Sequence, residues 1–297
     1  MALTTGQYPS FLKPIIEKAW GDSDPYINQL YPKVFEVRKS NDAYEQDVAL
    51  STFGLPSIKT EGGNYVEDTS GQLWTSTVEH TEYSLGFSIT EKAMEDLKDM
   101  PLAQKGTEWL KRSMYKNMDV VAFNLFNNAT STTFGDGKEL ASTTQIATTG
   151  SYSNYVSSDV SELSLETAVI AILQYKDDRG LFLNLAPQNI VIPPASIFLA
   201  NRLLRSTARV GTADNDTNAL KQLGFLQKDP IVSPYISDTD SWALITNADN
   251  GLVFYERVMP QIATDNDFIT GNMLIKSRSR FAATIFNKRA VYYSDGA

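Results

Sequence analysis

Residues 83–89, YSLGFSI, alternate between large apolar and small side chains. A period of two predicts a strand with one buried face. Residues 49–59, ALSTFGLPSIK, are also extended, and Pro56 suits an edge strand. Residues 60–72, TEGGNYVEDTSGQ, lie between them and are dense in turn formers. We therefore predict a long hairpin over residues 46–89. Because an isolated two-stranded ribbon is marginal in water, we expect it to lie on a surface that can belong to another molecule.

A long amphipathic helix is predicted over about residues 101–129. Ser88 and Glu91 have the spacing of a capping box for a short helix before it, which Pro101 ends or restarts. The apolar residues of the long helix form one stripe, namely Leu110, Met114, Met118, Val121 and Leu125. At about 1.5 Å per residue, this helix is a rod on the order of 43 Å long.

The middle of the chain predicts a helix, a strand and a second helix. The first helix lies within residues 163–180, with Ser164 as its cap and Gly180 past its end. Its buried face comprises Leu165, Val169, Ile172 and Leu173. A strand at 188–192 then meets two prolines and continues as a helix over about 195–206.

The two ends of the chain differ in pattern. Residues 1–45 have no sustained period, and a short helix at 11–20 is limited by Pro14 to a few turns. We interpret this segment as an arm that packs on something else. From about residue 224 onward the pattern is one of strands. The predicted fold class is α+β, with one long helix and strands gathered toward the carboxyl end.

Composition excludes some classes of protein but does not identify the function. The 297 residues include 26 basic and 35 acidic residues, a net charge of −9, which argues against a protein whose whole surface binds nucleic acid or anionic membrane. We find no signal peptide and no apolar run long enough to span a bilayer, so we predict no membrane contact. The absence of cysteine suits a reducing compartment, and we expect a soluble, intracellular protein.

Few residues suit catalysis or metal binding. The single histidine, His80, lies near Glu79 and Glu82, but these neighbours face different sides of a strand, so we interpret His80 as solvated on an edge ribbon. Phosphate-loop and nucleophile-elbow motifs are missing, and the Asp-rich segments lack the glycine that an EF-hand loop needs at position six. We therefore predict no catalytic residue, no cofactor and no metal site.

One basic segment stands out, KSRSRFAATIFNKR at residues 276–289. Lys276, Arg278 and Arg280 alternate and therefore share one face of a strand, and further basic residues follow at Lys288 and Arg289. Contact with nucleic acid is one interpretation. We favour ion pairing with an acidic surface of a neighbouring copy, because the rest of the chain supplies the acid.

The order of these elements resembles the major capsid protein of tailed bacteriophages, the Hong Kong ninety-seven-type fold. NIVIPPASIFLANRLL (189–204) is similar to the proline-containing strand-to-helix corner of this family. GNMLIKSRSRFAATIFNKRAVYYS (271–294) resembles its closing arginine-bearing hairpin. DGKELAST (136–143) resembles a segment of capsid proteins related to the major head subunit of transposable phages. The resemblance covers essentially the whole chain, in order.

The resemblance implies four structural parts. They are an amino-terminal arm (1–45), an extended loop (46–89), a peripheral domain with the long helix (90–160 and 250–297) and an axial domain (161–249). The implied function is a structural subunit that assembles into hexamers and pentamers of an icosahedral shell around double-stranded DNA. Candidate contacts between subunits are Lys59, Tyr65, Trp74, Lys276, Arg278 and Arg280.

The resemblance also implies partners and a location. Many relatives carry a long amino-terminal scaffolding segment, but here the arm begins almost at Met1, so we expect a separate scaffolding protein or none. Other implied partners are a portal, decoration proteins and packaged DNA held without sequence specificity. The protein would be assembled in the host cytoplasm and reside in the virion.

Two other functions are alternatives to the interpretation as a capsid protein. An acidic hydrolase could use paired carboxylates such as Glu61 and Glu67, with the hairpin as a lid; it predicts a deep pocket with two opposed carboxylates about 5–10 Å apart. A nucleic-acid-binding protein could use Lys276, Arg278 and Arg280.

Overall fold

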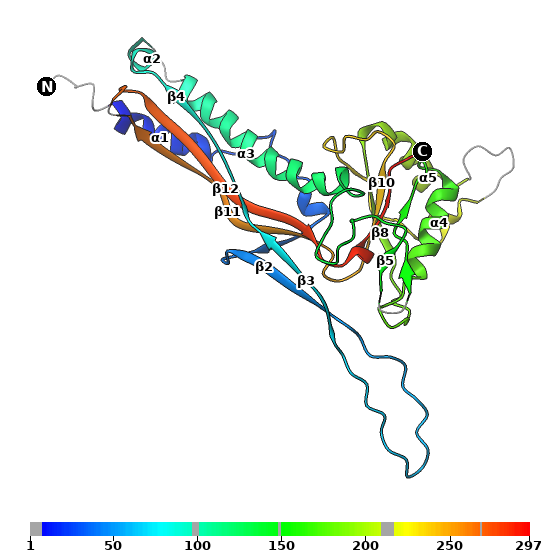
Figure 1. The fold of residues 1–297 in the computed structure, drawn as a ribbon. Coiled ribbons are helices and arrows are strands. Elements are labelled where there is room, and N and C mark those ends of the chain that lie inside the picture. The colour runs from blue at the N-terminus through cyan, green and yellow to red at the C-terminus, as the bar shows by residue number, and fades with distance from the viewer. Residues whose placement is uncertain (1–7, 97–100, 148–149, 209–216, 268) are drawn as a thin grey trace.

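A long helix lies along a twisted sheet at one end of the molecule, and a second sheet with its own helices forms the other end (Figure 1). The computed structural model describes residues 8–96, 101–147, 150–208, 217–267 and 269–297. The helices are α1 (Tyr8–Gly21), η2 (Tyr31–Lys33), α2 (Glu91–Asp96), α3 (Pro101–Asn127), α4 (Glu162–Leu173), η3 (Pro194–Ser196), α5 (Ile197–Arg205), α6 (Ala219–Gln222) and η4 (Lys288–Ala290). The strands are β1 (Glu36–Lys39), β2 (Tyr44–Leu50), β3 (Gln72–Glu79), β4 (Thr81–Ile89), β5 (Gln145–Ile146), β6 (Ser151–Tyr152), β7 (Tyr155–Val156), β8 (Pro187–Ile192), β9 (Ile231–Val232), β10 (Trp242–Thr246), β11 (Leu252–Asn266), β12 (Met273–Ile285) and β13 (Val291–Ser294).

The first sheet has four strands in the order β1-β11-β12-β4. Its centre is the long antiparallel pair β11–β12, with β1 added in parallel and β4 antiparallel. Along the first part of β12 odd-numbered residues are buried and even-numbered residues are exposed. This alternation gives the sheet one face packed on α3 and one face open to solvent.

The long helix α3 confirms the predicted rod of about residues 101–129. Leu110, Met114 and Met118 are buried as predicted. Beyond Met118 the buried stripe continues in steps of four to Ala122 and Phe126, so it drifts around a helix of 3.6 residues per turn, whereas the predicted stripe took a step of three. Val121 and Leu125, assigned to the stripe from the sequence, are half-buried beside it.

The second sheet has five strands in the order β7-β13-β10-β8-β9. Successive residues of β8 enter different hydrophobic clusters, Val191 with α3 and Ile190 and Ile192 with α4 and α5. The sheet is therefore covered on both faces. After β8, Pro193 and the short η3 lead into α5, as the strand-to-helix corner in the sequence predicts.

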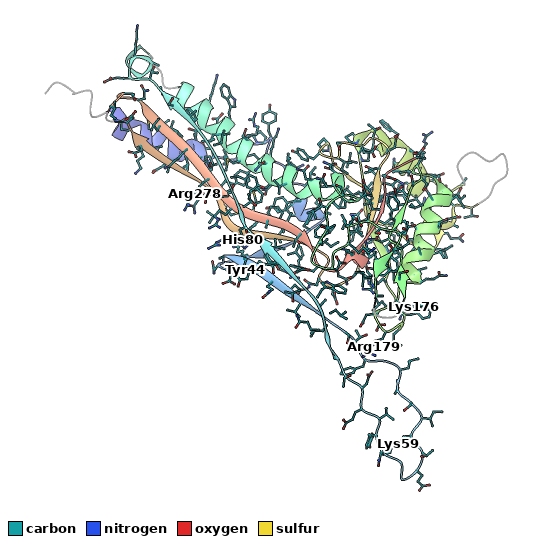
Figure 2. All side chains as sticks on the ribbon, viewed as in Figure 1. Tyr44, Lys59, His80, Lys176, Arg179 and Arg278 are labelled. Atoms are coloured by element: carbon teal, nitrogen blue, oxygen red, sulfur yellow. The ribbon has the colours of Figure 1, made fainter. Side chains whose placement is uncertain are left out.

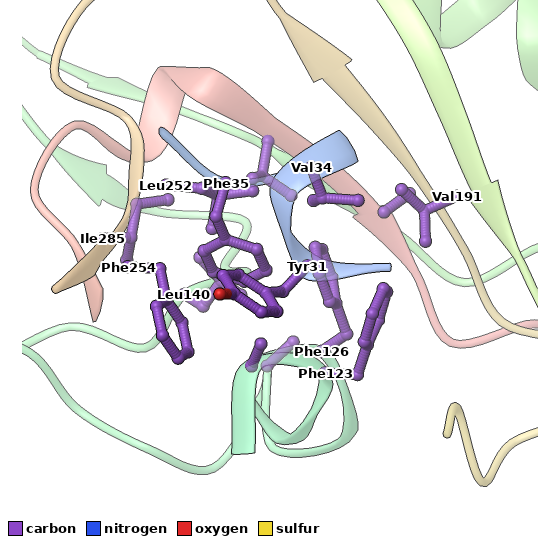
Figure 3. Packing of buried hydrophobic residues seen from close by; sticks show 14 of the residues in the cluster. Tyr31, Val34, Phe35, Phe123, Phe126, Leu140, Val191, Leu252, Phe254 and Ile285 are labelled. Atoms are coloured by element: carbon purple, nitrogen blue, oxygen red, sulfur yellow. The ribbon is translucent and has the colours of Figure 1, made fainter. Parts of the chain in front are cut away.

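The amino-terminal segment packs on the long helix and the first sheet. The buried Asp119 carboxylate accepts the backbone N–H groups of Leu30 and Tyr31 at 2.8 and 2.9 Å. The Tyr31 hydroxyl donates to Glu256 at 2.6 Å, and its ring packs 4.2 Å from the ring of Phe254. Figure 3 shows Tyr31 and Phe35 in this cluster, between α3 and the strands.

Two helix caps differ from the prediction. Ser88 lies in β4, and Thr90 instead accepts the Ala93 N–H at the start of α2. For α4, Ser161 is the N-cap and Ser164 occupies the third helical position, where the two side chains complete a capping box. In both cases the neighbouring segment decides where the helix begins, and residue type alone does not.

The strand predicted at residues 83–89 is present as β4, but its partner differs. It pairs with β12 in the four-stranded sheet, while the ribbon consists of β2 and β3. Figure 1 shows β3 continuing into β4 as the chain passes from the ribbon onto the sheet. The part of the hairpin outside both sheets is thus residues 51–71, which we call the extended loop.

Candidate functional site

The extended loop (residues 51–71) projects away from the body of the subunit (Figure 1). It contains no helix or strand, and most of its residues are exposed. Its exposed large apolar side chains are Phe53, Leu55, Ile58, Tyr65 and Val66. Ile58 is 97% exposed, so no described residue of the same chain covers it. Exposed apolar patches of this kind mark contacts with other molecules.

The tip of the loop is a tight turn. The Gly63 N–H donates to the Thr60 carbonyl at 2.9 Å, and Gly62 has a φ of +75°, which glycine adopts without strain. Beside the turn, the Lys59 ammonium lies 3.6 Å from the centroid of the Tyr65 ring. This contact brings together two of the predicted contact residues and holds both at the far end of the molecule (Figure 2). Trp74, predicted with them, is half-buried in β3 instead.

The basic residues of β12 lie on the open face of the four-stranded sheet, opposite α3. Lys276 and Arg278 are exposed there, and their side chains have no hydrogen bond or ion pair to any described residue. Arg280, half-buried, approaches Glu82 at 4.0 Å and donates to the His80 carbonyl at 3.4 Å. The prediction that the three share one face is confirmed by the alternation of the strand.

A groove of about 730 Å³ runs over this basic face. Its walls and floor come from three strands, β4, β11 and β12. Opposite Lys276 lie Gly86 and Ala263, and opposite Arg278 lie Ser84 and Gln261. Glycine, alanine and serine among these neighbours leave room beside the cations, and the two unpaired cations favour contact with carboxylates.

The family described as phage capsid protein matches residues 74–294 of this sequence. The chain belongs to this family. The sequence resemblance to phage major capsid proteins is thereby confirmed, and this capsid protein is a structural subunit of a phage shell. A search of curated proteins finds no match.

Solved capsid structures share the fold of the capsid protein. The capsid of Myoviridae phage XM1 aligns with a TM-score of 0.57 at 10% identity, covering 93% of this chain and 94% of that one. The capsid of a native GTA particle gives 0.57 at 15% identity, covering 93% and 92%. A virus-like particle from Pyrococcus furiosus gives 0.54 at 11%, covering 97% and 99%. At these identities the likeness shows the fold, and it confirms the predicted α+β capsid architecture.

His80 of the capsid protein is buried, so its interpretation as a solvated residue is wrong. It lies between β3 and β4 and is 5% exposed. Its Nε2 lies 3.2 Å from the Ser40 hydroxyl and 3.4 Å from Glu45, and its ring meets Tyr255 edge-on. The chain passes from the ribbon onto the sheet at this residue, and the imidazole contacts Glu45 of β2 and Tyr255 of β11.

Lys288 and Arg289, grouped with the basic strand in the sequence, lie elsewhere. Lys288 is 4% exposed and is paired with Asp136 at 2.5 Å. Arg289 donates to the Lys176 carbonyl at 2.8 Å and stacks 4.5 Å from the Tyr152 ring centroid. These two residues join segments of the capsid protein to one another and do not extend the exposed basic face.

The structure gives no support to the hydrolase alternative. Glu61 and Glu67 are exposed on the extended loop and do not face each other across a cavity. The groove over β12 contains Glu82 as its one carboxylate. Within the described ranges, no group of three or more His, Asp and Glu residues is placed to hold a metal ion. Over the same ranges, no helix is long and apolar enough to cross a bilayer.

Proposed function

We propose that this capsid protein is the shell-forming subunit of a tailed phage or prophage. Copies of the chain would form hexamers and pentamers, and these would close an icosahedral shell around double-stranded DNA. The observation that carries the assembly step is the extended loop. Between residues 53 and 67 it makes no hydrogen bond or ion pair to any described residue outside the loop, yet it exposes five large apolar side chains. We infer that another copy of the chain covers these apolar side chains in the assembled shell.

In this proposal the extended loop binds to the four-stranded sheet of a neighbouring copy. The loop carries Glu61, Glu67 and Asp68 against the single Lys59. The groove over β12 offers Lys276 and Arg278 without partners among the described residues. Opposite charges steer the two surfaces together, and the exposed apolar side chains of the loop supply buried area.

We propose bounds for the four parts that the sequence resemblance implies. We assign the arm to residues 1–45, the loop with its ribbon to 46–89, the peripheral domain to 90–160 and 250–297, and the axial domain to 161–249. Two short strands of the five-stranded sheet, β7 and β13, come from the segments assigned to the peripheral domain. If the axial domain is defined by that sheet, these strands belong to it.

The proposal also covers the partner proteins, the absence of catalysis and the place of assembly. We expect no catalytic activity, and as partners a scaffolding protein, a portal, and decoration proteins where the shell carries them. Assembly would take place in the host cytoplasm. The similarity of residues 136–143 to the head subunit of transposable phages stays a prediction.

Light scattering and negative-stain electron microscopy of the purified chain, alone and coexpressed with its scaffold, test this function. The expected result is shells, rings or sheets built from hexamers and pentamers. A stable monomer under every condition would contradict it.

A further inference from the structure

We infer that the turn at residues 177–179 is a clasp that fixes the direction in which the extended loop leaves its subunit. The turn joins α4 to β8, so it belongs to the unit built on the five-stranded sheet. Figure 2 shows Lys176 and Arg179 beside the root of the loop and Lys59 at its far end. The inference rests on the proposed function, in which the loop must reach a neighbouring copy.

The outgoing segment of the loop, residues 51–54, is held through Thr52. Its N–H lies 3.1 and 3.3 Å from the two carboxylate oxygens of Asp178. Its hydroxyl lies 2.7 Å from an oxygen of Asp177 and 2.7 Å from an oxygen of Asp178. The two aspartates are only 8% and 7% exposed. Hydrogen bonds to charged groups out of water are among the stronger ones in proteins.

The returning segment of the loop, residues 68–71, is held through Arg179. Its guanidinium donates to the Thr69 carbonyl at 2.8 Å and approaches Asp68 at 3.6 Å. Asp68 in turn accepts the Gly54 N–H from the outgoing segment at 2.8 Å. The turn therefore contacts both segments of the loop, and Asp68 joins the two segments to each other.

The turn that forms the clasp is itself held by several hydrogen bonds. Asp177 accepts the N–H groups of Arg179 and Leu181 at 2.9 and 2.8 Å, and its own N–H donates to the Leu181 carbonyl. Gly180 has a φ of +91°, which lets the chain reverse here without strain. Arg289 fixes the preceding residue by donating to the Lys176 carbonyl at 2.8 Å. A chain of contacts thus runs from the end of β12 through this turn to the loop.

The contacts of the clasp lie at the base of the extended loop, where they can set the direction of the whole loop. Residues 53–67 make no hydrogen bond or ion pair to described residues outside the loop, so the root sets the course of the whole segment. A small rotation at Thr52 displaces Ile58 at the tip by a much larger distance. Asp177, Asp178 and Arg179 are in this sense positioning residues for assembly, because they hold the root of the segment that reaches a neighbouring copy in the proposed function.

The clasp can be tested by a distance measurement on the full chain, which has no cysteine of its own. Nitroxide labels are attached at Ile58→Cys on the tip and Leu223→Cys on the five-stranded unit, positions that are 97% and 70% exposed. Double electron–electron resonance then gives the distribution of tip distances. We expect one narrow distance for the labelled parent and its loss in Thr52→Val combined with Arg179→Gln.

Matched variants separate the clasp from general damage. Thr52→Ser keeps the hydroxyl, and Thr69→Val alters a residue that offers the clasp only its backbone carbonyl. Both are expected to keep the narrow distance. An unchanged distribution in the double variant, or equal broadening in Thr69→Val, would overturn the inference. If the double variant does not fold by circular dichroism, Thr52→Val alone is measured and judged by the same outcomes.

Failure of the clasp and failure of the proposed function give different results. If the parent chain forms no shells in the microscope, the proposed function is contradicted while the distance distributions still decide the clasp. If the parent forms shells and the double variant keeps the parent's distances, only the clasp is wrong. Support for both is a parent that assembles and a folded double variant with broad distances that does not.

Discussion

The Lys288 ammonium and the Asp136 carboxylate lie 2.5 Å apart with side chains that are only 4% and 7% exposed. Lys288 follows β12, and Asp136 lies in the turn after α3. The same ammonium donates to the Lys138 carbonyl at 2.7 Å and lies 5.5 Å from the Phe134 ring centroid. The pair thus fastens residues 134–138 (FGDGK), which have no regular structure of their own, to the end of the antiparallel pair β11–β12.

Removing one member of this pair should destabilise the subunit strongly. Asp136→Ala leaves the buried Lys288 charge without its counterion, and such losses cost about 3–5 kcal/mol. Chemical unfolding of the isolated subunit measures the loss. Lys276→Ala on the open face is the matched control and should stay within about 0.5 kcal/mol of the parent. An Asp136→Ala subunit as stable as this control would contradict the assignment.

The same variant should respond to pH. Burial lowers the pKa of Lys288, and Asp136 is the main group that opposes this shift. Without Asp136, the folded pKa falls further below that of the unfolded chain, so folding releases a proton between the two values. Stability must then rise with pH. We expect the deficit of Asp136→Ala to shrink as the pH increases from neutral toward about 10. Unfolding curves over this range that stay parallel to the parent's would contradict the prediction.

Asp119 anchors the amino-terminal segment, and two substitutions separate its charge from its hydrogen bonds. Asp119→Ala leaves the N–H groups of Leu30 and Tyr31 buried without an acceptor, at about 1–3 kcal/mol each. Asp119→Asn keeps an acceptor oxygen and should be far milder. Equal losses in the two variants, measured by chemical unfolding, would show that the hydrogen bonds are not what matters.

The pH dependence of Asp119→Asn is also fixed in sign. Burial raises the pKa of the Asp119 carboxyl despite the two N–H donors, so its charge opposes folding at neutral pH. The folded chain takes up a proton as the pH falls through the raised pKa, and the parent gains stability there relative to the Asn variant. We expect the Asn variant to compare best with the parent at neutral pH and less well near pH 4. The opposite trend would contradict the raised pKa.

The extended loop should be dispensable for folding and required for assembly. Replacing residues 53–68 by Asn-Gly keeps β2, β3 and the bond between the Ser51 N–H and the Gly71 carbonyl. Because the removed residues lie outside the hydrophobic clusters, thermal unfolding should change little. Shells should be absent in electron microscopy. A shortened subunit that unfolds, or one that still forms shells, would show that the loop has another role.

Reversing charge on the open face tests what Lys276 and Arg278 bind. Lys276→Glu with Arg278→Glu should leave a folded subunit, because both side chains are exposed and unpaired among the described residues. Assembly should be lost or should require higher salt, which screens the new repulsion. Lys105→Glu, an exposed site on α3, is the control. If the parent binds DNA at low salt and the double variant loses that binding while assembling normally, the face serves nucleic acid instead.

Patterns with a short period were readable from the sequence. The stripe on α3 and the alternation of β4 and β12 are set by residues three to four or two apart, so they predict the elements that the structure contains. The shared face of Lys276 and Arg278 followed from the same rule. The Pro193 corner was readable because proline fixes its own backbone angle.

Features made by distant segments were not readable. His80 is enclosed by Ser40, Glu45 and Tyr255, which come from three other places in the chain. Residues 177–179 had the composition of a helix end, and nothing nearby indicates that they bind Thr52, more than a hundred residues earlier. The pairing of β4 with β12 was likewise not readable, because the two strands lie far apart in the sequence.

A cryo-electron microscopy reconstruction of the assembled particle tests the central claim most directly. We predict a closed shell of hexamers and pentamers in which residues 51–71 of each subunit lie over the basic groove of a neighbour, with Glu61 or Glu67 near Lys276 and Arg278. A particle in which the extended loop contacts no other copy, or a chain that remains a monomer with its scaffold present, would contradict the account.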